Sequence, residues 1–449
     1  MRDIPKHIFR EYDIRGLVDK DLTEERVEKI GKAYGSVIQG NVAVGEDVRE
    51  SSGRYSKALI KGILSTGCNV IDIGLSTTPM LYFSIYYYKQ DGGVMITGSH
   101  NPMEFNGIKL CKGLLSLYGK DIQGIREIIE KEDFKKGEGK VEEKKPLEHY
   151  YSYIRNKIKL NKKLKVVIDA GNGTAGLIAV RLLEDLGCEV IPLYCELDGT
   201  FPNHLPDPTV EKYLQDLIKK VKEEKADVGI GYDGDADRLG VIDEEGNIIW
   251  GDRLLMLYSG EIQKRKPGSK VIFDVKCSHL LGEAVKKQGG IPIMWKTGHS
   301  LIKSKMYEEN AELAGEMSGH IFFKDRFLGF DDAVYASCRF LEILSNTDKK
   351  ASQLLEDVPK TYYTPEIRVD CPEDKKFLIP EELKKELKNE FNIYGIDGAR
   401  IQFRDGWGLV RASNTQPVLV LRFESETQER LEEIRKFVEG KVEEIKNRV

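Results

Sequence analysis

The chain has 449 residues, which is too long for one ordinary hydrophobic core and favours about three or four domains. With 40% hydrophobic and 32% charged residues it has the composition of a globular protein, and no apolar run approaches the length that crosses a membrane. The formal net charge of −5 provides no basic surface for nucleic acid at the level of the whole chain.

The cysteines and the N-terminus indicate the compartment. The seven cysteines are odd in number, scattered along the chain and free of C-x-x-C spacing. This pattern favours reduced thiols over a disulfide or zinc framework. The N-terminal residues contain no apolar signal core. We therefore expect a cytoplasmic protein with no nucleic-acid partner and no membrane association.

The first predicted elements are an extended segment over residues 7–16 that ends in a turn, and an amphipathic helix from Thr23 to about Gln39. A strand–helix–strand pattern then occurs three times. Each copy has two short apolar strands and a helix between them, over residues 42–73, 166–193 and 271–294. The helices are expected at about 51–65, 174–186 and 278–288. Such units form parallel sheets that are covered on both faces.

Three copies at intervals of about a hundred residues predict three related mixed α/β domains. The pattern changes after about residue 361, where strands near 367–369, 408–411 and 417–423 and helices near 380–391 and 426–446 predict a smaller α+β domain. Turns and charged stretches place the domains at residues 1–147, 148–249, 250–361 and 362–449. The fold class is therefore α/β.

The hexapeptide Thr97-Gly98-Ser99-His100-Asn101-Pro102 follows the apolar strand 93–96. A hydroxyl just beyond a strand end, beside a glycine that lets a large group approach, is well placed to be a nucleophile. The simpler interpretation is a surface turn with a polar tip.

The second motif is Asp233-Gly234-Asp235-Ala236-Asp237-Arg238, between two apolar runs. Three carboxylates so close together are unfavourable unless a cation neutralises them, and hard oxygen ligands with small spacers suit one Mg²⁺ ion. A phosphate on Ser99 would complete the coordination, so Ser99, Asp233, Asp235 and Asp237 are the predicted metal ligands. A solvated acidic turn is one alternative. A calcium EF-hand is another, but Arg238 occupies its essential glycine position and the flanks are strands.

Later in the chain, Arg411 precedes Ser413, Asn414 and Thr415, a set of donors that suits an anion. Glu316 and Ser318 can bind vicinal sugar hydroxyls, and His320 can orient their loop. Alone, each of these segments is also compatible with a structural turn.

Six segments together resemble the α-D-phosphohexomutase family, in its phosphomannomutase/phosphoglucomutase branch. They are the two motifs above, Glu11–Gly16, Asn106–Lys109, Gly315–His320 and Arg411–Pro417, in order over about four hundred residues. The resemblance implies four domains around one cleft, with motifs from different domains meeting there. It also implies that Arg15 lies near the phosphoserine and that Tyr12, Lys276 and His299 contact substrate.

The implied reaction interconverts hexose 1-phosphate and 6-phosphate of glucose or mannose through a hexose 1,6-bisphosphate, with Ser99 as phosphoryl carrier. Arg238 and Arg15 supply positive charge near the transferred group. We expect Lys109, with a lowered pKa, to be the general base, and His100 to support the site. The partners would be small sugar phosphates, and the protein a monomer or small homo-oligomer.

Three alternatives stay open. Phosphoglucosamine mutases typically have Gln where Met317 stands and Ser-Gly-Thr-Glu-Pro in the last loop, whereas this chain has Ser413-Asn414-Thr415-Gln416-Pro417. A metal-dependent sugar phosphatase would pass the phosphoryl group from Ser99 to water. A catalytically inactive sugar-phosphate sensor would need neither the nucleophile nor the metal ligands.

Overall fold

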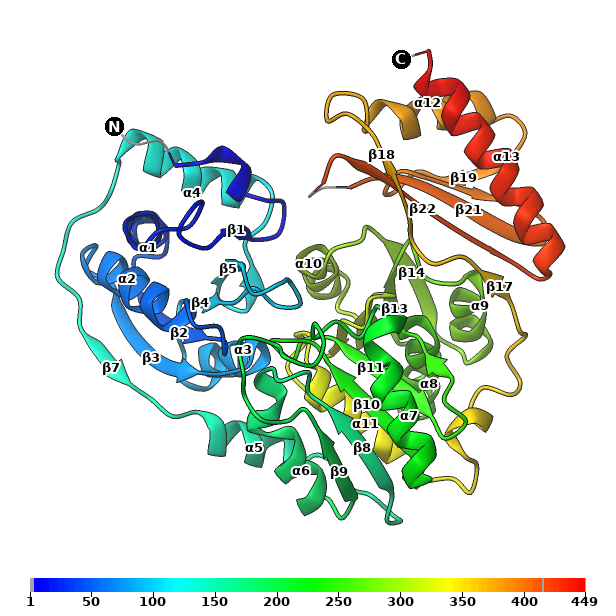
Figure 1. Cartoon of the computed structure of the whole chain (residues 1–449), viewed down its shortest axis with the longest axis horizontal. Helices are drawn as coiled ribbons and strands as arrows, with labels where there is room; N and C mark the ends of the chain where they lie inside the picture. The colour runs from blue at the N-terminus through cyan, green and yellow to red at the C-terminus, as the bar shows by residue number, and fades with distance from the viewer. Residues whose placement is uncertain (1–3, 414–415, 449) are drawn as a thin grey trace.

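The chain forms four structural units, each built on its own β-sheet, which follow one another from the N-terminus (blue) to the C-terminus (red) in Figure 1. The computed structural model describes residues 4–413 and 416–448. The units that follow are named first to fourth after their sheets. The four sheets have the strand orders β1-β5-β4-β2-β3-β7 with β6 on β5, β12-β11-β10-β8-β9, β14-β13-β15-β16, and β17-β22-β21-β20-β19 with β18 on β22.

The first unit contains seven strands and the helices that cover them. The strands are β1 (Ile14–Leu17), β2 (Asn41–Glu46), β3 (Asn69–Leu75), β4 (Gly92–Ile96), β5 (Phe105–Lys112), β6 (Leu115–Ser116) and β7 (Val141–Glu143). The helices are η1 (Lys6–Ile8), α1 (Glu24–Ile38), α2 (Ser52–Leu64), α3 (Thr78–Tyr87) and α4 (Lys120–Lys131). Thr23 caps α1 by accepting from the amide of Arg26, which confirms the predicted helix start.

The second and third units repeat a parallel arrangement. The second has β8 (Lys165–Asp169), β9 (Glu189–Leu193), β10 (Val228–Tyr232), β11 (Leu239–Asp243), β12 (Ile248–Ile249), α5 (Leu147–Arg155), η2 (Thr174–Leu177), α6 (Ala179–Asp185), η3 (Glu211–Leu214) and α7 (Gln215–Glu224). The third has β13 (Lys270–Asp274), β14 (Ile291–Trp295), β15 (Leu313–Gly315), β16 (Ile321–Phe323), α8 (Gly251–Arg265), α9 (His279–Lys287), α10 (His299–Glu309), α11 (Ala333–Ser345) and η4 (Ala351–Gln353).

The fourth unit is an antiparallel sheet with two helices on one face (Figure 1). It contains β17 (Tyr362–Tyr363), β18 (Ile367–Asp370), β19 (Asn392–Tyr394), β20 (Ala399–Gln402), β21 (Gly406–Ala412), β22 (Val418–Ser425), α12 (Leu378–Leu387) and α13 (Gln428–Lys446). The α/β class, with three related units and a smaller α+β unit, is confirmed. In each of the three copies the two predicted strands pair in parallel across the intervening helix.

Two local predictions are wrong. Residues 7–16 are not one extended segment, because η1 and a bend precede β1, and Gly16 lies inside that strand. The helix expected over 174–186 begins as the 3-10 turn η2 and becomes α-helical only at Ala179. Its first turn is held differently because the amide and hydroxyl of Thr174 both donate to the carbonyl of Gly234, at 3.0 and 3.1 Å.

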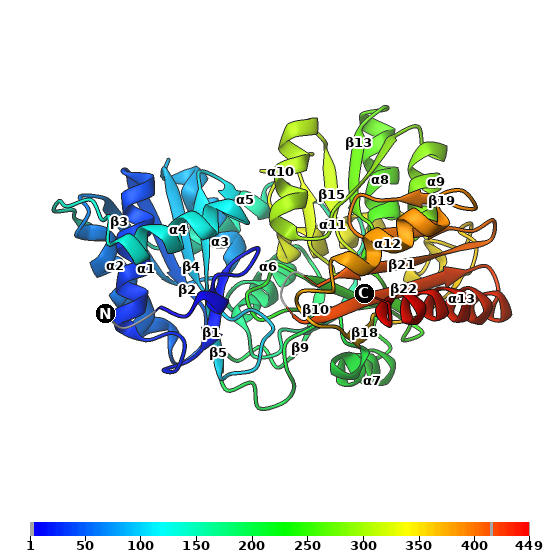
Figure 2. The same cartoon turned by 90° about the horizontal axis from the view of Figure 1, so that it is seen from above.

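The fourth unit has a large core of its own, and a small apolar cluster of Val275, Trp407 and Leu409 joins it to the third unit. One cluster of buried side chains is continuous through the first three units and includes Met95, Ile168 and Phe330. The fourth unit has its own cluster, with Ile379, Leu421 and others. Seen from above, the first unit and the fourth unit lie at opposite ends of the molecule (Figure 2). Among the described residues no helix is both long and apolar enough to cross a bilayer, and the seven cysteines in the described part of the chain are free thiols.

Candidate active site

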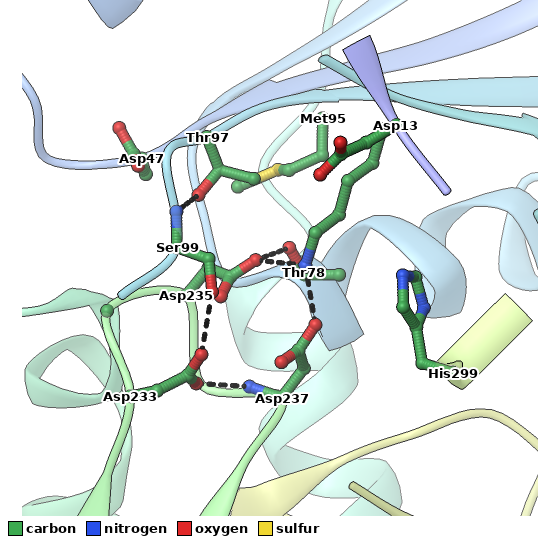
Figure 3. Close-up of polar contacts among 12 residues, drawn as sticks. Asp13, Asp47, Thr78, Met95, Thr97, Ser99, Asp233, Asp235, Asp237 and His299 are labelled. Carbon is green, nitrogen blue, oxygen red and sulfur yellow. Dashed lines mark hydrogen bonds and ion pairs between the residues drawn. The ribbon is translucent and has the colours of Figure 1, made fainter. Parts of the chain in front are cut away.

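Ser99 lies in the turn between β4 and β5, and it is almost fully buried at 3% exposure. Its backbone is in the left-handed region with φ of 48°, and its amide donates to Thr97 Oγ1 at 2.8 Å. The hydroxyl donates to Asp233 Oδ2 at 2.8 Å, across 134 residues of sequence (Figure 3). The two motifs on which the sequence analysis depends therefore meet in space.

The aspartate loop connects β10 and β11, which pair in antiparallel fashion, so the EF-hand alternative is excluded. Glu244, which would be the twelfth EF-hand residue, binds Ser352 instead, at 2.6 Å. Backbone contacts hold the loop from two sides: the carbonyl of Asp235 accepts from Thr78 at the start of α3, and that of Ala236 from Ala333 at the start of α11. The first and third units thus fix the shape of a loop from the second.

The three aspartates present carboxylate oxygens within 4.8 Å of one another, and all three residues are fully buried. Burial, and then the charges of Asp235 and Asp237, raise the pKa of Asp233 well above its ordinary value. Asp235 Oδ1 and Asp237 Oδ1 are buried and have no hydrogen-bond partner among the described residues. Uncompensated carboxylate oxygens of this kind fit a hard divalent cation, so this set of residues could bind a metal.

Lys109 lies inside β5, and its ammonium group donates to Asp235 Oδ2 at 2.5 Å and Asp237 Oδ2 at 2.6 Å. This corrects the expected lowered pKa. Burial alone would lower the pKa of Lys109, but the two carboxylates outweigh it and raise the pKa above its ordinary value. In this arrangement Lys109 is a cation that balances two of the three acids.

The side chain of His100 turns toward the hydroxyl of Ser99, with Nδ1 at 3.0 Å from Oγ. Burial, and then the charges of Arg238 and Arg15, lower its pKa well below the ordinary value, so the ring is neutral at pH 7. Arg15 belongs to β1, and its guanidinium donates to Asp13 Oδ2 at 2.5 Å. A neutral imidazole therefore contacts the predicted nucleophile.

The third unit brings the predicted sugar loop against the aspartate loop. Arg238 and His320 form an isolated antiparallel bridge, and Arg238 Nε donates to His320 Nε2 at 3.0 Å. The rings of His320 and His299 stack at 5.3 Å. His320 Nδ1 lies 3.1 Å from Asp331 Oδ2. The sequence analysis did not identify Asp331, whose signal is an acidic pair just before a helix start.

Glu316 and Ser318 face the neighbouring loop of the same unit. Glu316 accepts from the amide of Gly298 and from Ser318 Oγ, the latter at 3.1 Å. Burial raises the pKa of Glu316 above its ordinary value. Tyr12, from the first unit, donates its hydroxyl to the carbonyl of Thr297 at 2.8 Å and meets the edge of the His299 ring.

The fourth unit approaches this loop through Asp397, a residue that the sequence analysis also missed. Asp397 Oδ2 accepts from Arg411 Nε at 2.9 Å and from the amide of Thr297 at 3.1 Å. Ser413 directly follows β21, and its Oγ accepts from the amide of Gln416. Lys276 pairs with Glu366 at 2.7 Å. Asn414 and Thr415 lie outside the described residues.

Comparisons with known proteins agree with this architecture. Models of the phosphoglucomutase/phosphomannomutase family match in order: α/β/α domain I over residues 6–136, domain II over 148–246, domain III over 250–362 and the C-terminal domain over 366–441. A phosphomannomutase/phosphoglucomutase of Pseudomonas aeruginosa is 50% identical over 437 residues, covering 96% of this chain and 94% of that protein.

Two further relatives cover nearly the whole chain. A phosphoglucomutase of Neisseria meningitidis is 46% identical and covers 99% of this chain and 98% of its own. The crystal structure of a phosphoglucomutase/phosphomannomutase family protein from Burkholderia thailandensis is 40% identical, with a TM-score of 0.93 and 98% coverage of both chains. The chain therefore belongs to the phosphoglucomutase/phosphomannomutase family, and it is an isomerase of the hexose phosphate mutase class.

Proposed function

We propose that this enzyme interconverts hexose 1-phosphate and hexose 6-phosphate, of glucose and/or mannose, with Ser99 as the phosphoryl carrier. The observation that carries this proposal is the 2.8 Å contact between Ser99 Oγ and Asp233 Oδ2. A buried hydroxyl and a set of three acids, brought from two units to one point, provide a nucleophile together with ligands for a cation.

Asp233, Asp235, Asp237 and a phosphate on Ser99 would hold one Mg²⁺ ion. When bound, such an ion neutralises the charge that develops on a transferred phosphoryl group. Lys109 and Arg238 add fixed positive charge beside the same carboxylates, and Arg15 adds another beside His100. The ammonium of Lys109 binds two of the three acids directly.

The transfer from phosphoserine to a sugar hydroxyl forms a new O–P bond on the sugar and breaks the Ser99 Oγ–P bond. The sugar hydroxyl gives up one proton and Ser99 Oγ takes up one, so the complete step releases no net proton. His100 is placed to deliver or hold the second proton, with Nδ1 at 3.0 Å from Oγ. Reversal of the step on the other phosphate of a hexose 1,6-bisphosphate returns the phosphoryl group to Ser99.

The bisphosphate must turn end for end, so the enzyme needs a second phosphate subsite and a sugar loop that accepts both orientations. We assign the subsite to Arg411, Ser413, Asn414 and Thr415, with Lys276 nearby, and the sugar contacts to Glu316, Ser318, His320, His299 and Tyr12. Met317 and the Ser-Asn-Thr-Gln-Pro sequence from Ser413 favour glucose and mannose phosphates over glucosamine phosphate. Side-by-side assay of the three sugar 1-phosphates tests this choice.

Replacing Ser99 by Ala tests the proposal. We expect S99A to lose turnover and the ability to become phosphorylated by hexose 1,6-bisphosphate, but to keep its affinity for sugar phosphate. Intact mass before and after incubation with the bisphosphate, together with the coupled assay, measures both properties. Turnover in S99A would refute the role of Ser99. Release of free phosphate in step with substrate loss would instead indicate a phosphatase.

We also propose domain boundaries at residues 147, 249 and 361, and a cytoplasmic monomer or small homo-oligomer. The first boundary falls at the start of α5, and the second just before α8. The third lies between η4 and β17, where the chain passes from the third sheet to the fourth.

A further inference from the structure

The guanidinium group of Arg49 lies against the backbone of the Ser99 turn. Its Nη2 donates to the carbonyls of Ser99, at 2.8 Å, and Asn101, at 2.5 Å. Its Nη1 donates to the carbonyls of Pro102, at 2.8 Å, and Phe105, at 3.0 Å. The side chain of Arg49 is only 1% exposed. A single buried cation thus binds four backbone carbonyls of the segment that contains the nucleophile.

Asp47 holds both the arginine and the turn. Its Oδ2 accepts from the amide of Gly98 at 3.1 Å and lies 3.2 Å from Arg49 Nε. Its Oδ1 accepts from the amide of Arg49 and from Ser52 Oγ, at 3.0 and 2.5 Å. Figure 3 shows Asp47 beside Thr97 and the Ser99 amide. The Asp47 carboxylate compensates the buried charge of Arg49, so the pair can remain ionised in the interior.

This contact explains the unusual backbone of the turn. Ser99 has a positive φ of 48°, which costs free energy for a residue with a side chain. A Cβ on Gly98 would lie 2.4 Å from Arg49 Nε, so only glycine lets the turn rest on the guanidinium. We infer that Asp47 and Arg49 are positioning residues that hold Ser99 in its left-handed conformation and aim its hydroxyl at the aspartate loop. This inference rests on the proposed role of Ser99.

The second unit closes over the same pair. The ring of Phe201 lies 5.0 Å from the guanidinium carbon of Arg49. The neighbouring Gly199 lies so close that a Cβ there would be 2.3 Å from the carbonyl of Val48. The second unit also carries the three aspartates. The positioning pair therefore lies where the nucleophile's unit meets the unit of the proposed metal ligands.

The third unit contains the same kind of contact, between an acid at the end of a parallel strand and the backbone amide of a site loop. In the first unit the last paired residues of β2 and β4 are Glu46 and Ile96. The acid that directly follows β2, Asp47, accepts from the amide of Gly98, two residues after Ile96. In the third unit the last pair of β13 and β15 is Phe273 and Gly315. There the next acid, Asp274, accepts from the amide of Met317, again two residues beyond the pair, at 3.1 Å. An acid at this position therefore holds a site loop in two of the repeated units.

The test compares R49K with the wild-type protein. Lysine keeps the charge but cannot bind four carbonyls in one plane. We expect kcat to fall about 100-fold, as a displacement of about 1 Å at a reacting group can cause, with little change in KM. In a single turnover, enzyme phosphorylated with hexose 1,6-bisphosphate and then mixed with hexose 6-phosphate should lose its phosphoserine about 100-fold more slowly, as measured by intact mass after quenching.

R339K is the matched control, because Arg339 is equally buried and ion-paired, with Asp325 at 3.0 Å, but belongs to α11 and does not contact the site loops within the described structure. We expect R339K to lower the unfolding temperature and to leave kcat of the folded enzyme unchanged. If R49K does not fold, the D47N variant tests the inference instead. Asparagine has about the volume of aspartate and keeps an acceptor for the amide of Gly98. We expect D47N to lower kcat by a smaller factor than R49K and to leave KM unchanged.

Normal kcat and normal phosphoserine turnover in folded R49K would overturn the inference, as would normal values in D47N if R49K does not fold. An equal loss of kcat in R339K would also overturn it, because the effect would then belong to any buried arginine. The outcome is separable from the proposed function. An inactive S99A with a fully active R49K contradicts only the positioning role, whereas an active S99A contradicts the role of Ser99 itself.

Discussion

Two adjacent acids just before α11, Asp331 and Asp332, have pKa values shifted in opposite directions. Burial would raise the pKa of Asp331, but the ammonium of Lys303 and the ring of His320 lower it below its ordinary value. For Asp332, burial outweighs the hydrogen bonds of Tyr335 and Tyr150 and raises the pKa to about 7. Asp332 caps the helix by accepting from the amide of Tyr335 at 2.8 Å, and it accepts from the hydroxyl of Tyr150 at 2.7 Å.

The raised pKa of Asp332 predicts a pH-dependent stability. Between about pH 4 and pH 7 the folded protein binds a proton that the unfolded chain has released, so this residue's contribution to stability falls as the pH rises through that window. D332N keeps a capping acceptor but cannot ionise. We expect D332N to be more stable than the wild type at pH 8, by roughly 2–4 kcal/mol, and similar to it at pH 4.

Urea unfolding at pH 4, 5, 6, 7 and 8 measures this difference. D332A serves as a control for the helix cap, and it should be less stable than D332N at every pH because no side chain accepts from Tyr335. A constant difference in unfolding free energy between wild type and D332N across the whole range would show that folding does not raise the pKa of Asp332.

At the scale of elements, α1 and α2 pack with their backbones in close approach. A Cβ on Gly31 of α1 would lie 2.3 Å from the carbonyl of Leu59, and a Cβ on Gly62 of α2 would lie 2.1 Å from that of Glu28. These helices cover the sheet that carries Ser99 (Figure 1). The contact leaves no space for a methyl group unless one helix moves.

We therefore expect G62A to destabilise the protein by about 1–3 kcal/mol through overpacking, although alanine favours a helix. Gly124 of α4 is the matched control, since a Cβ there has nothing within 4 Å. G124A should stabilise the protein by about 0.5–1 kcal/mol through helix propensity alone. Urea denaturation of the two variants gives both values, and a stabilising G62A would mean that the helices can separate at little cost.

At the scale of the whole molecule, polar contacts join the fourth unit to the third. The guanidinium of Arg400 donates to the carbonyls of Val275 and Cys277, at 2.6 and 2.8 Å, and stacks on Trp407. The carboxylate of Glu424 accepts from Ser278, at 2.7 Å, and from Trp407, at 2.7 Å. Burial would raise the pKa of Glu424, but the nearby ring of His279, whose Nδ1 lies 3.7 Å from Oε2, and the hydroxyls of Thr361 and Ser278 lower it to about 2.

We expect E424Q to weaken this interface by about 1–3 kcal/mol, the cost of losing a charged acceptor that is shared by several donors. Hydrogen exchange should become faster in β20, β21 and β22, whereas α1, α2 and α4 of the first unit, which pack in a separate cluster, should keep their protection. E426Q, at an exposed position two residues further on, is the control. It should change neither the stability of the interface nor the hydrogen exchange of β20, β21 and β22. Equal loss of protection in all four units would mean that they unfold together.

Much of the architecture was predictable from residue pattern. The three strand–helix–strand copies, the strand before Ser99 and the strands around the aspartate loop follow from local apolar runs, because a parallel strand buried on both faces is continuously apolar. The resemblance of six short segments was enough to indicate the family. The helix expected over 174–186 was only partly right, because the hydrogen bonds of Thr174 to Gly234 replace the first α-helical turn.

The residue pattern was enough to propose which side chains carry the chemistry: a serine after a strand, three acids in a loop and a set of cations. Their charges and orientations depend on neighbours that only folding brings together. Lys109 was expected to have a lowered pKa, but its pKa is raised because the fold places its ammonium between two carboxylates from another unit. Arg49 gave no signal, since the carbonyls it binds belong to backbone about fifty residues away and come together only on folding.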